Sequence, residues 1–261
     1  MSTSLLTTHG LSVSIGGKQV CANLDFTLEA GQCWGLLGIN GVGKTTLLHT
    51  LAGLRPADRG SVMLEQQNIT ELPRRSVAQQ LGVLLQDDTD PFPGTVLETV
   101  LMGRHPHLGR WQWESEQDLA LARQALTEFE LEALCERQIN TLSGGERRRL
   151  ALATLFTQDP QIFLLDEPTN HLDPHHQIQL LTQLRARIRS NKTESPRGLL
   201  MILHDINLTT RFCDHVLLLY GEGDVCCGPI EDVLSPENLS RLYGHTMTAV
   251  AGPNGPIYIP G

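Results

Sequence analysis

Apolar and polar residues alternate from residue 11 to residue 30, on both sides of the pair Gly16-Gly17. A period of two is typical of a half-buried strand, and glycines between two such segments favour a tight turn. The pattern therefore predicts a β-hairpin. The next apolar stretch, 33–37, is uninterrupted and leads into a glycine-rich loop. A helix from Thr45 to about Ala52 follows, with Gly53 as its C-cap.

Three further apolar runs predict buried strands, and each ends at a polar side chain: 81–85 before Gln86, 161–165 before Asp166, and 199–203 before His204. Helical patterns alternate with these runs. The segment of about 95–158 reads as mostly helical, so we expect a helical subdomain inserted between strands of the core. Alternation of strands and helices, with chemistry at the strand ends, indicates an α/β sheet that carries its site at the carboxyl edge.

Polar residues of capping type mark where several helices begin. Thr95 with Glu98 and Ser143 with Glu146 have the spacing of capping boxes, and Asp173-Pro174 has the order of an N-cap followed by proline. The Asp173 helix should run to about Arg189. Segments 87–94 and 190–197 are rich in turn residues and predict surface loops.

The end of the chain is predicted from shorter signals. Residues 216–220 and 225–227 flank glycines and predict a closing hairpin. A helix near 236–243 and a Pro/Gly-rich tail complete the expected order of elements.

Composition narrows the class of protein. The 261 residues carry a formal net charge of −9, so nucleic acid is not an expected partner. No apolar run approaches the roughly 18 residues that cross a bilayer, and the N-terminus lacks the features of a signal peptide. We therefore expect a cytoplasmic protein whose six cysteines are reduced. A soft-metal site at Cys226-Cys227 is an alternative to simple packing of these side chains.

The segment 38–45 has the residues of a phosphate loop. A glycine-rich turn between a strand and a helix turns backbone N–H groups toward phosphate oxygens, Lys44 reaches the β- and γ-phosphates, and the Thr45 hydroxyl suits Mg²⁺. The alternative is a glycine-rich turn with an incidental lysine.

The polar side chains at the strand ends complete a hydrolytic site. Asp166 is the expected acidic partner of Mg²⁺, and Glu167 can polarise an attacking water. Gln86 can bind both metal and water, and His204 can contact the γ-phosphate. The alternative interpretation of Asp166-Glu167 is a pair of N-cap residues at a helix start. The alternative for Gln86 or for His204, each taken alone, is a purely structural role.

Residues 142–146, Leu-Ser-Gly-Gly-Glu, read as a second phosphate site. A serine and two glycines at a helix start present a hydroxyl and N–H groups to an anion, where the helix dipole adds positive potential. One chain has no evident use for two such sites on one triphosphate. A second copy of the chain would supply the missing half.

Taken together, these motifs resemble the nucleotide-binding subunit of an ABC transporter, from about Leu11 to Tyr243. The Walker A loop is 38–45, the Q-loop glutamine is Gln86, the signature is 142–146 and the Walker B strand is 162–166. Glu167, the D-loop Leu172-Asp173 and the switch histidine His204 follow in family order.

The resemblance implies a single domain over 1–261, with a P-loop NTPase fold (a RecA-like core sheet), an antiparallel β-subdomain and a helical subdomain at about 95–158 that carries the signature. It implies a head-to-tail dimer with ATP and Mg²⁺ between the Walker A loop of one copy and the signature of the other. The catalytic residues would be Glu167, His204 and Gln86. The ligands of the metal ion would be Thr45, Gln86 and Asp166. The residues expected to contact nucleotide are Ile15, Gly38, Asn40, Gly41, Gly43, Lys44, Thr45, Thr46, Ser143, Gly144, Gly145 and Asp173.

One of these residues departs from the family pattern. Ile15 occupies the stretch in which relatives usually place an aromatic side chain that stacks on adenine. Stacking contributes roughly 1–3 kcal/mol per base, of which an aliphatic side chain recovers only part. We therefore expect looser base selectivity.

The segment 96–107 contains Gly-Arg-His-Pro-His and resembles ABC importers of iron–siderophores, haem and cobalamin. That resemblance implies integral membrane permease subunits, a periplasmic or surface substrate-binding protein, and attachment at the cytoplasmic face of the inner membrane. Residues 87–107 would meet the permease, with Phe92 and Arg104 at the contact. The alternatives for the function are an exporter and a soluble ABC ATPase without a transport role. The alternatives for the segment are that Arg104–His107 only ends a helix, or that His105 and His107 belong to a metal site.

Overall fold

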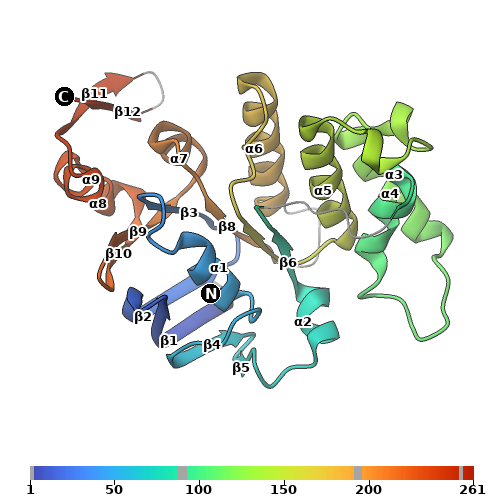
Figure 1. Ribbon diagram of the computed structural model, residues 1–261, viewed down its shortest axis with the longest axis horizontal. Helices are drawn as coiled ribbons and strands as arrows, with labels where there is room; N and C mark the ends of the chain where they lie inside the picture. The colour runs from blue at the N-terminus through green and yellow to red at the C-terminus, as the bar shows by residue number, and fades with distance from the viewer. Residues whose placement is uncertain (1–2, 87–92, 191–195, 253–254) are drawn as a thin grey trace.

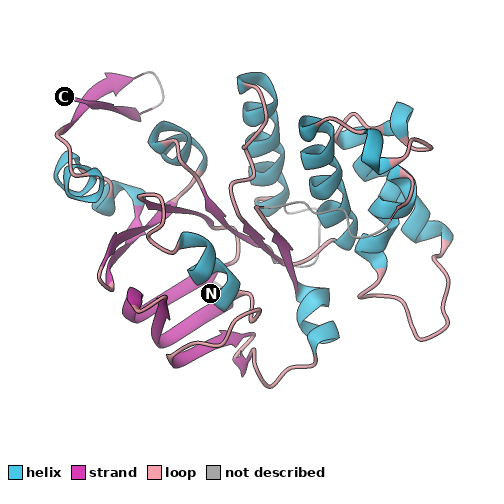
Figure 2. Ribbon diagram, in the orientation of Figure 1, coloured by secondary structure: helices cyan, strands magenta, loops and turns pink. Residues whose placement is uncertain are grey.

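A six-stranded, mainly parallel sheet forms the centre of the molecule, with strand order β10-β9-β3-β8-β7-β6 (Figures 1 and 2). The computed structural model describes residues 3–86, 93–190, 196–252 and 255–261. Only β10 runs antiparallel to its neighbour in this sheet. The strands are β3 (Cys33–Gly38), β6 (Leu81–Leu84), β7 (Ile162–Leu165), β8 (Gly198–Ile202), β9 (His215–Gly221) and β10 (Asp224–Pro229).

Apolar side chains on both faces of this sheet explain why its central strands have uninterrupted apolar sequences. In β7, Phe163 and Leu165 pack into one buried cluster, whereas Ile162 and Leu164 pack into another. A strand buried on both faces needs apolar residues at every position. The first cluster lies under the helices that follow β6, and the second lies between the central sheet, helix α1 and an antiparallel sheet.

The predicted N-terminal hairpin is confirmed. Strands β1 (Ser4–Ile15) and β2 (Lys18–Glu29) pair antiparallel around the turn at Gly16-Gly17. With β4 (Arg59–Leu64) and β5 (Gln67–Asn68) they form the antiparallel sheet β2-β1-β4-β5. Helix α1 (Lys44–Leu51) ends with Ala52 as its C-cap, so the prediction of Gly53 as the C-cap was wrong by one residue.

Helices fill the part of the chain between β6 and β7. The described ones are α3 (Val96–Leu101), η1 (Met102–Arg104), α4 (Glu116–Glu128), η2 (Glu132–Leu134), η3 (Ile139–Thr141) and α5 (Gly144–Gln158). The capping boxes predicted at Thr95 and Ser143 are both formed. These helices stand together at one end of the molecule, beside α6 (Pro174–Ile188), for which Asp173 is the N-cap as expected (Figure 1).

The C-terminal region differs from the prediction. The expected helix α9 (Pro236–Tyr243) is present, but the Pro/Gly-rich tail forms a hairpin of β11 (Met247–Gly252) and β12 (Gly255–Pro260). This hairpin packs on α7 (Ile206–Phe212), a helix that the sequence analysis did not predict, as it also did not predict α8 (Ile230–Val233). Both helices are too short to show a clear period of 3.6 residues.

Two predictions fall partly outside the described residues. They concern the loops at 87–94 and 190–197, of which 87–92 and 191–195 are not described. Within the described parts of the chain, no helix combines the length and apolar character that crossing a membrane requires.

Candidate functional site

The phosphate loop connects the end of β3 to the start of α1. Gly41 and Gly43 have φ values of +76° and +106°, a region that side chains with a Cβ rarely adopt. A Cβ on Gly43 would also lie 2.4 Å from Cγ2 of Val20. Glycine at position 43 is therefore required both by the backbone turn and by the contact with β2.

Lys44 lies within this loop and is buried. Its Nζ donates hydrogen bonds to the carbonyl oxygens of Gly38 at 2.8 Å and Ile39 at 3.1 Å. Burial lowers the pKa of the ammonium group, and the carboxylates of Glu167 and Asp166 act in the opposite direction. The positive charge is thus held at a fixed place beside two acidic side chains.

One pocket collects most of the side chains that the sequence analysis assigned to nucleotide and catalysis. The register of the parallel strands aligns their carboxyl ends, so residues that follow β3, β6, β7 and β8 meet at one edge. The pocket is lined by Ile15, Asn40, Gly41, Gly43, Lys44, Thr45, Thr46, Gln86, Glu167 and His204. Ile15 lies at its rim with 44% of its surface exposed.

Glu167 is the centre of a hydrogen-bond cluster in this pocket. Its Oε1 lies 2.6 Å from Nε2 of His204, and its Oε2 accepts hydrogen bonds from the amides of Gln86, at 3.3 Å, and Asn170. Glu167 has a positive φ of 49°, which is uncommon for a residue other than glycine and is found at functional sites. The cluster connects the residues that follow three neighbouring strands.

Asp166 is buried, and neither of its carboxylate oxygens has a hydrogen-bond partner among the described residues. Burial raises the pKa of this carboxyl. The Thr45 hydroxyl, which approaches without completing a hydrogen bond, lowers the pKa, and Glu167 raises it further. Unpartnered buried carboxylate oxygens beside a threonine hydroxyl are a donor set that fits a hard divalent cation.

Two residues of this site were not predicted. Arg148 is buried and donates to the carbonyl oxygens of Leu85 at 2.8 Å, Asp166 at 2.5 Å and Glu167 at 2.7 Å. It therefore connects α5 to the strand ends. Asn170 is the second residue that was not predicted. The sequence feature that could have indicated it is its position three residues after Glu167, in a turn-rich segment. Arg148 is the middle one of three consecutive arginines, of which only one can face the core.

The residues of the second phosphate site do not line this pocket. Ser143 is the N-cap of α5, and its backbone N donates to Oε2 of Glu146 at 2.7 Å. A Cβ on Gly144 would meet no atom within 4 Å, and on Gly145 only His171 O, at 3.5 Å. This helix start is therefore open at its surface.

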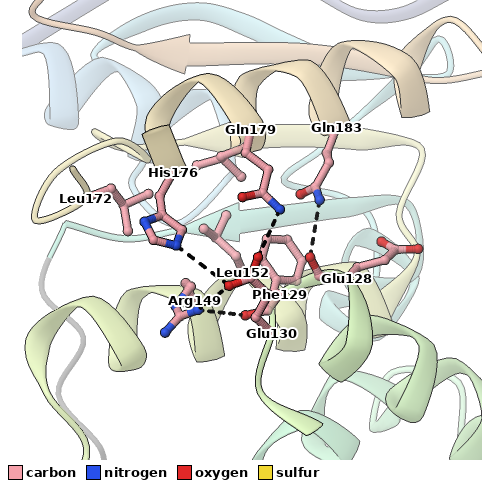
Figure 3. A pocket seen from close by; sticks show the side chains of 10 residues that line it. Glu128, Phe129, Glu130, Arg149, Leu152, Leu172, His176, Gln179 and Gln183 are labelled. Atoms are coloured by element: carbon pink, nitrogen blue, oxygen red, sulfur yellow. Dashed lines mark hydrogen bonds and ion pairs between the residues drawn. The ribbon is translucent and has the colours of Figure 1, made fainter. Parts of the chain in front are cut away.

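Asp173 also lies away from the pocket. It caps α6 by accepting a hydrogen bond from the backbone N of His176 at 3.0 Å, and its Oδ2 lies 2.7 Å from Nδ1 of the same residue. These hydrogen bonds lower the pKa of the Asp173 carboxyl. His176 and Arg149 both point toward Glu130 across a small pocket, at 3.8 and 3.5 Å (Figure 3). The start of α6 is thus connected to α5.

The Gly-Arg-His-Pro-His segment lies against the C-terminal end of α5. A Cβ on Gly103 would lie 2.3 Å from the carbonyl oxygen of Thr154, so only glycine permits this contact. Arg104 donates to Asp118 at 2.7 Å and to the carbonyl oxygens of Thr157 and Gln158 at 3.1 and 3.3 Å. The expectation that Arg104 faces outward toward a partner was wrong, because Asp118 and the last carbonyl groups of α5 hold its charge inside.

His107 in the same segment lies 2.9 Å from the carbonyl oxygen of Gln158, through Nε2. Phe92, the other residue expected at the contact with a partner, lies outside the described residues. No group of three or more histidine, cysteine or acidic side chains in the described part of the chain has a metal-binding arrangement.

Comparison with known proteins supports the family that the residues of the site predict. The family described as ABC transporter matches residues 21–170. A protein of Bacillus subtilis described as a probable siderophore transport system ATP-binding protein is 34% identical, over 100% of this chain and 94% of that protein. A hemin import ATP-binding protein of Pseudomonas aeruginosa is 39% identical over 92% of each, and the ferric enterobactin transport ATP-binding protein of Escherichia coli is 34% identical over 99% and 95%.

Solved structures show the same fold. A chain of a metal-chelate type ABC transporter in an inward-facing conformation has a TM-score of 0.82 and 26% identity, covering 99% of this chain and 97% of that one. The structure of CbiO1 from Clostridium perfringens, with a TM-score of 0.74 and 24% identity, covers 92% and 94%. The predicted P-loop NTPase fold is confirmed, and the chain belongs to the ABC transporter family as an ATPase subunit.

Proposed function

We propose that this chain hydrolyses ATP to power the import of a metal chelate: an iron–siderophore, haem or cobalamin. The pocket that joins the phosphate loop to Gln86, Glu167 and His204 supports the ATPase part. The relatives named for siderophore transport, hemin import and ferric enterobactin transport support the cargo. The shared fold does not give the direction of transport, since an Atm1-family exporter with ATP bound also has it, at 22% identity.

In this proposal the phosphate loop binds the triphosphate. Residues 38–46 supply backbone N–H groups, Lys44 neutralises β- and γ-phosphate oxygens, and Ile15 covers the adenine. Mg²⁺ would be held by the Thr45 hydroxyl, the Gln86 amide oxygen and Asp166, and when bound it neutralises charge on the phosphate oxygens. Lys44 is already fixed by Gly38 and Ile39, so it needs little reorganisation.

Glu167 is proposed to orient and polarise the attacking water, and His204 to contact the γ-phosphate. His204 lies 2.6 Å from Glu167, so it also fixes the direction of that carboxylate. Gln86 connects this pair to β6. Ser143, Gly144, Gly145 and Asp173 would contact the nucleotide bound by a second copy, in a head-to-tail dimer.

The whole chain, 1–261, is proposed to act as one ABC ATPase domain, with 95–158 as its helical subdomain. It would lie at the cytoplasmic face of the inner membrane, bound to permease subunits. A substrate-binding protein would deliver the chelate to those permease subunits. Residues 87–107 are proposed as the permease contact, and the exposed residues among those described there are Pro93, Glu98, Met102 and His105.

Reconstitution tests the proposal. The chain, reconstituted with a permease and a substrate-binding protein in vesicles that enclose the ATPase, should accumulate a ferric siderophore, hemin or cobalamin inside the vesicles when ATP is enclosed with it. Glu167→Gln should abolish accumulation. Transport of an amino acid or sugar instead, or movement of the chelate away from the ATPase side, would contradict the cargo or the direction.

A further inference from the structure

Arg148 is a buried cation in the second turn of α5, with only 3% of its surface exposed. Its Nη1 donates to the carbonyl oxygen of Leu85 at 2.8 Å, and its Nη2 donates to those of Asp166 at 2.5 Å and Glu167 at 2.7 Å. Burial of a charge costs free energy, and charge-assisted hydrogen bonds to carbonyl oxygens offset that cost. One side chain therefore holds the ends of two neighbouring strands, β6 and β7.

The sheet itself fixes these strand ends only in part. The ladder between β6 and β7 ends at the pair Leu84–Leu165, and the backbone N of Asp166 still donates to the carbonyl oxygen of Leu84 at 2.9 Å. Asp166 is therefore fixed by the sheet. Glu167 lies beyond the ladder, so its position depends on other contacts.

The hydrogen bonds of Arg148 fit a turn of the chain at Glu167. Successive carbonyl groups of an extended strand point to opposite sides. One nitrogen can reach the carbonyls of both Asp166 and Glu167 only if the chain turns between them, and the φ of +49° at Glu167 provides that turn. A positive φ at a residue with a Cβ persists where surrounding contacts hold it. Arg148 supplies one such contact, and the backbone N of Asn170, which donates to Glu167 O at 3.1 Å, supplies another.

The same turn sets the direction of the Glu167 side chain. Its Oε1 lies 2.6 Å from Nε2 of His204, and its Oε2 accepts from the Gln86 amide at 3.3 Å. Gln86 directly follows Leu85, the other residue whose carbonyl Arg148 binds. Both partners of the Gln86–Glu167 contact are thus anchored on one guanidinium. Arg148 does not itself line the pocket that holds them.

We propose that Arg148 is a positioning residue for ATP hydrolysis, which holds the turn that aims the Glu167 carboxylate at the attacking water. The inference rests on the proposed function, in which Glu167 polarises that water. Because Arg148 acts through Glu167 and lies outside the pocket, its loss lowers turnover without weakening ATP binding.

Steady-state ATPase measurements on the full chain with Arg148→Lys test the inference. Lysine keeps the positive charge, but its single nitrogen cannot reach both Leu85 and the turn at Glu167. The turnover number should fall by about tenfold to a hundredfold, while the KM for ATP stays within about twofold. Arg148→Gln, a second variant, loses the charge as well and should lower turnover at least as much.

A double-mutant cycle separates the positioning of Glu167 from other effects of the substitution. Burial raises the pKa of the Asp166 carboxyl and the charge of Arg148 lowers it, so Arg148→Lys, which keeps the charge, is the variant for the cycle. In the Glu167→Gln background no carboxylate remains to be aimed. Arg148→Lys should then change the single-turnover rate of phosphate release by less than about twofold.

Arg149→Lys is the matched control, at the neighbouring position of the same helix. Arg149 points toward Glu130 across a small pocket, at 3.5 Å, and donates to the carbonyl oxygen of Phe129 at 3.3 Å (Figure 3). Neither contact involves a strand end. Turnover and KM of this variant should both stay within about twofold of the wild type.

Wild-type turnover in Arg148→Lys would overturn the inference, and so would a loss of equal size in the Glu167→Gln background. If both Arg148 variants lose the cooperative thermal unfolding transition, Arg148 is required for the fold, and the inference fails as well. Failure of the proposed function gives a different result. The wild-type chain would then not hydrolyse ATP, or Glu167→Gln would turn over normally.

Discussion

Glu167 is the residue that connects the polar side chains of the pocket to one another. Its two carboxylate oxygens contact the side chains of His204, Gln86 and Asn170, while Arg148 binds its carbonyl oxygen. These contacts fix both the backbone and the side chain. A general base is effective when its position is fixed before the reaction, because little reorganisation is then needed in the transition state.

Replacing the carboxylate by an amide tests this role. In Glu167→Gln the amide oxygen still accepts from Asn170 and Gln86, and the amide nitrogen can donate to His204, so the fold and ATP binding should be retained. The turnover number should fall by orders of magnitude, since an amide is a very weak base. Steady-state phosphate release and the thermal midpoint of unfolding give the two readouts. Turnover close to that of the wild type would reject the assignment.

The rim of the pocket allows a second test at the scale of one residue. Ile15→Tyr should tighten ATP binding by up to roughly tenfold, because stacking adds about 1.4 kcal/mol over an aliphatic contact. Ile259→Tyr is the matched control, since Ile259 is 41% exposed on the C-terminal hairpin, against 44% for Ile15. Titration with a fluorescent ATP analogue measures both. An unchanged affinity for Ile15→Tyr would mean that another residue already covers the adenine.

Three residues at the strand ends of the site were predictable for a simple physical reason. Gln86, Asp166 and His204 follow apolar runs, and parallel strands bring such positions to one edge of the sheet. Arg148 and Asn170 could not be found in this way. Their partners are backbone carbonyls and a carboxylate of distant segments, and no periodic pattern encodes that pairing.

At the scale of elements, helix α5 is fixed at both ends. Its first turn is closed by the Ser143 capping box, and its last carbonyl groups accept from Arg104 and His107. A cation at a helix C-terminus is favourable because the last carbonyls have no partner within the helix. The Gly-Arg-His-Pro-His segment therefore positions α5, the helix that begins at the proposed signature. The sequence predicted the capping box, which is local, but not this contact, which joins residues about 50 positions apart.

Asp118 holds Arg104 in place, and its titration should be visible in stability. Hydrogen bonds from Ser115 and then Arg104 lower the pKa of this carboxyl to about 2, from 3.8. A lowered pKa means that the stabilisation is present above the unfolded-state pKa and is lost as pH falls through the folded-state pKa. Asp118→Asn should therefore reduce the free energy of unfolding by about 1–3 kcal/mol near neutral pH.

The difference between Asp118→Asn and wild type should shrink between about pH 4 and pH 2. Chemical denaturation at a series of pH values measures it. Glu116→Gln, an exposed change on the same turn of α4, should leave stability nearly unchanged. A penalty for Asp118→Asn that stays constant over this pH range would show that the ion pair with Arg104 contributes nothing.

At the scale of the whole molecule, the two proposed nucleotide half-sites do not lie in one pocket. Lys44 and Glu167 share a pocket that Ser143 does not line, and the start of α5 is open at the surface.

The sequence analysis did not predict the C-terminal β-hairpin, which packs on α7 beside His204. Glycine and proline favour turns, and pairing of the two short strands depends on tertiary contacts such as Asn207 with Tyr258.

Separation of the half-sites predicts that ATP joins two copies. In the Glu167→Gln background, ATP should convert monomer to dimer, because each triphosphate would receive N–H groups from a second chain. Ser143→Arg, added to that background, should prevent the conversion, since a large cation blocks the open helix start. Light scattering with and without ATP measures the mass. Ser235→Arg removes the N-cap of α9, a helix remote from the signature, so it controls for the loss of about 1 kcal/mol that any lost N-cap causes. This control should still dimerise. An ATP-dependent dimer that persists with Ser143→Arg would exclude the head-to-tail arrangement, because the signature would then not be part of the contact.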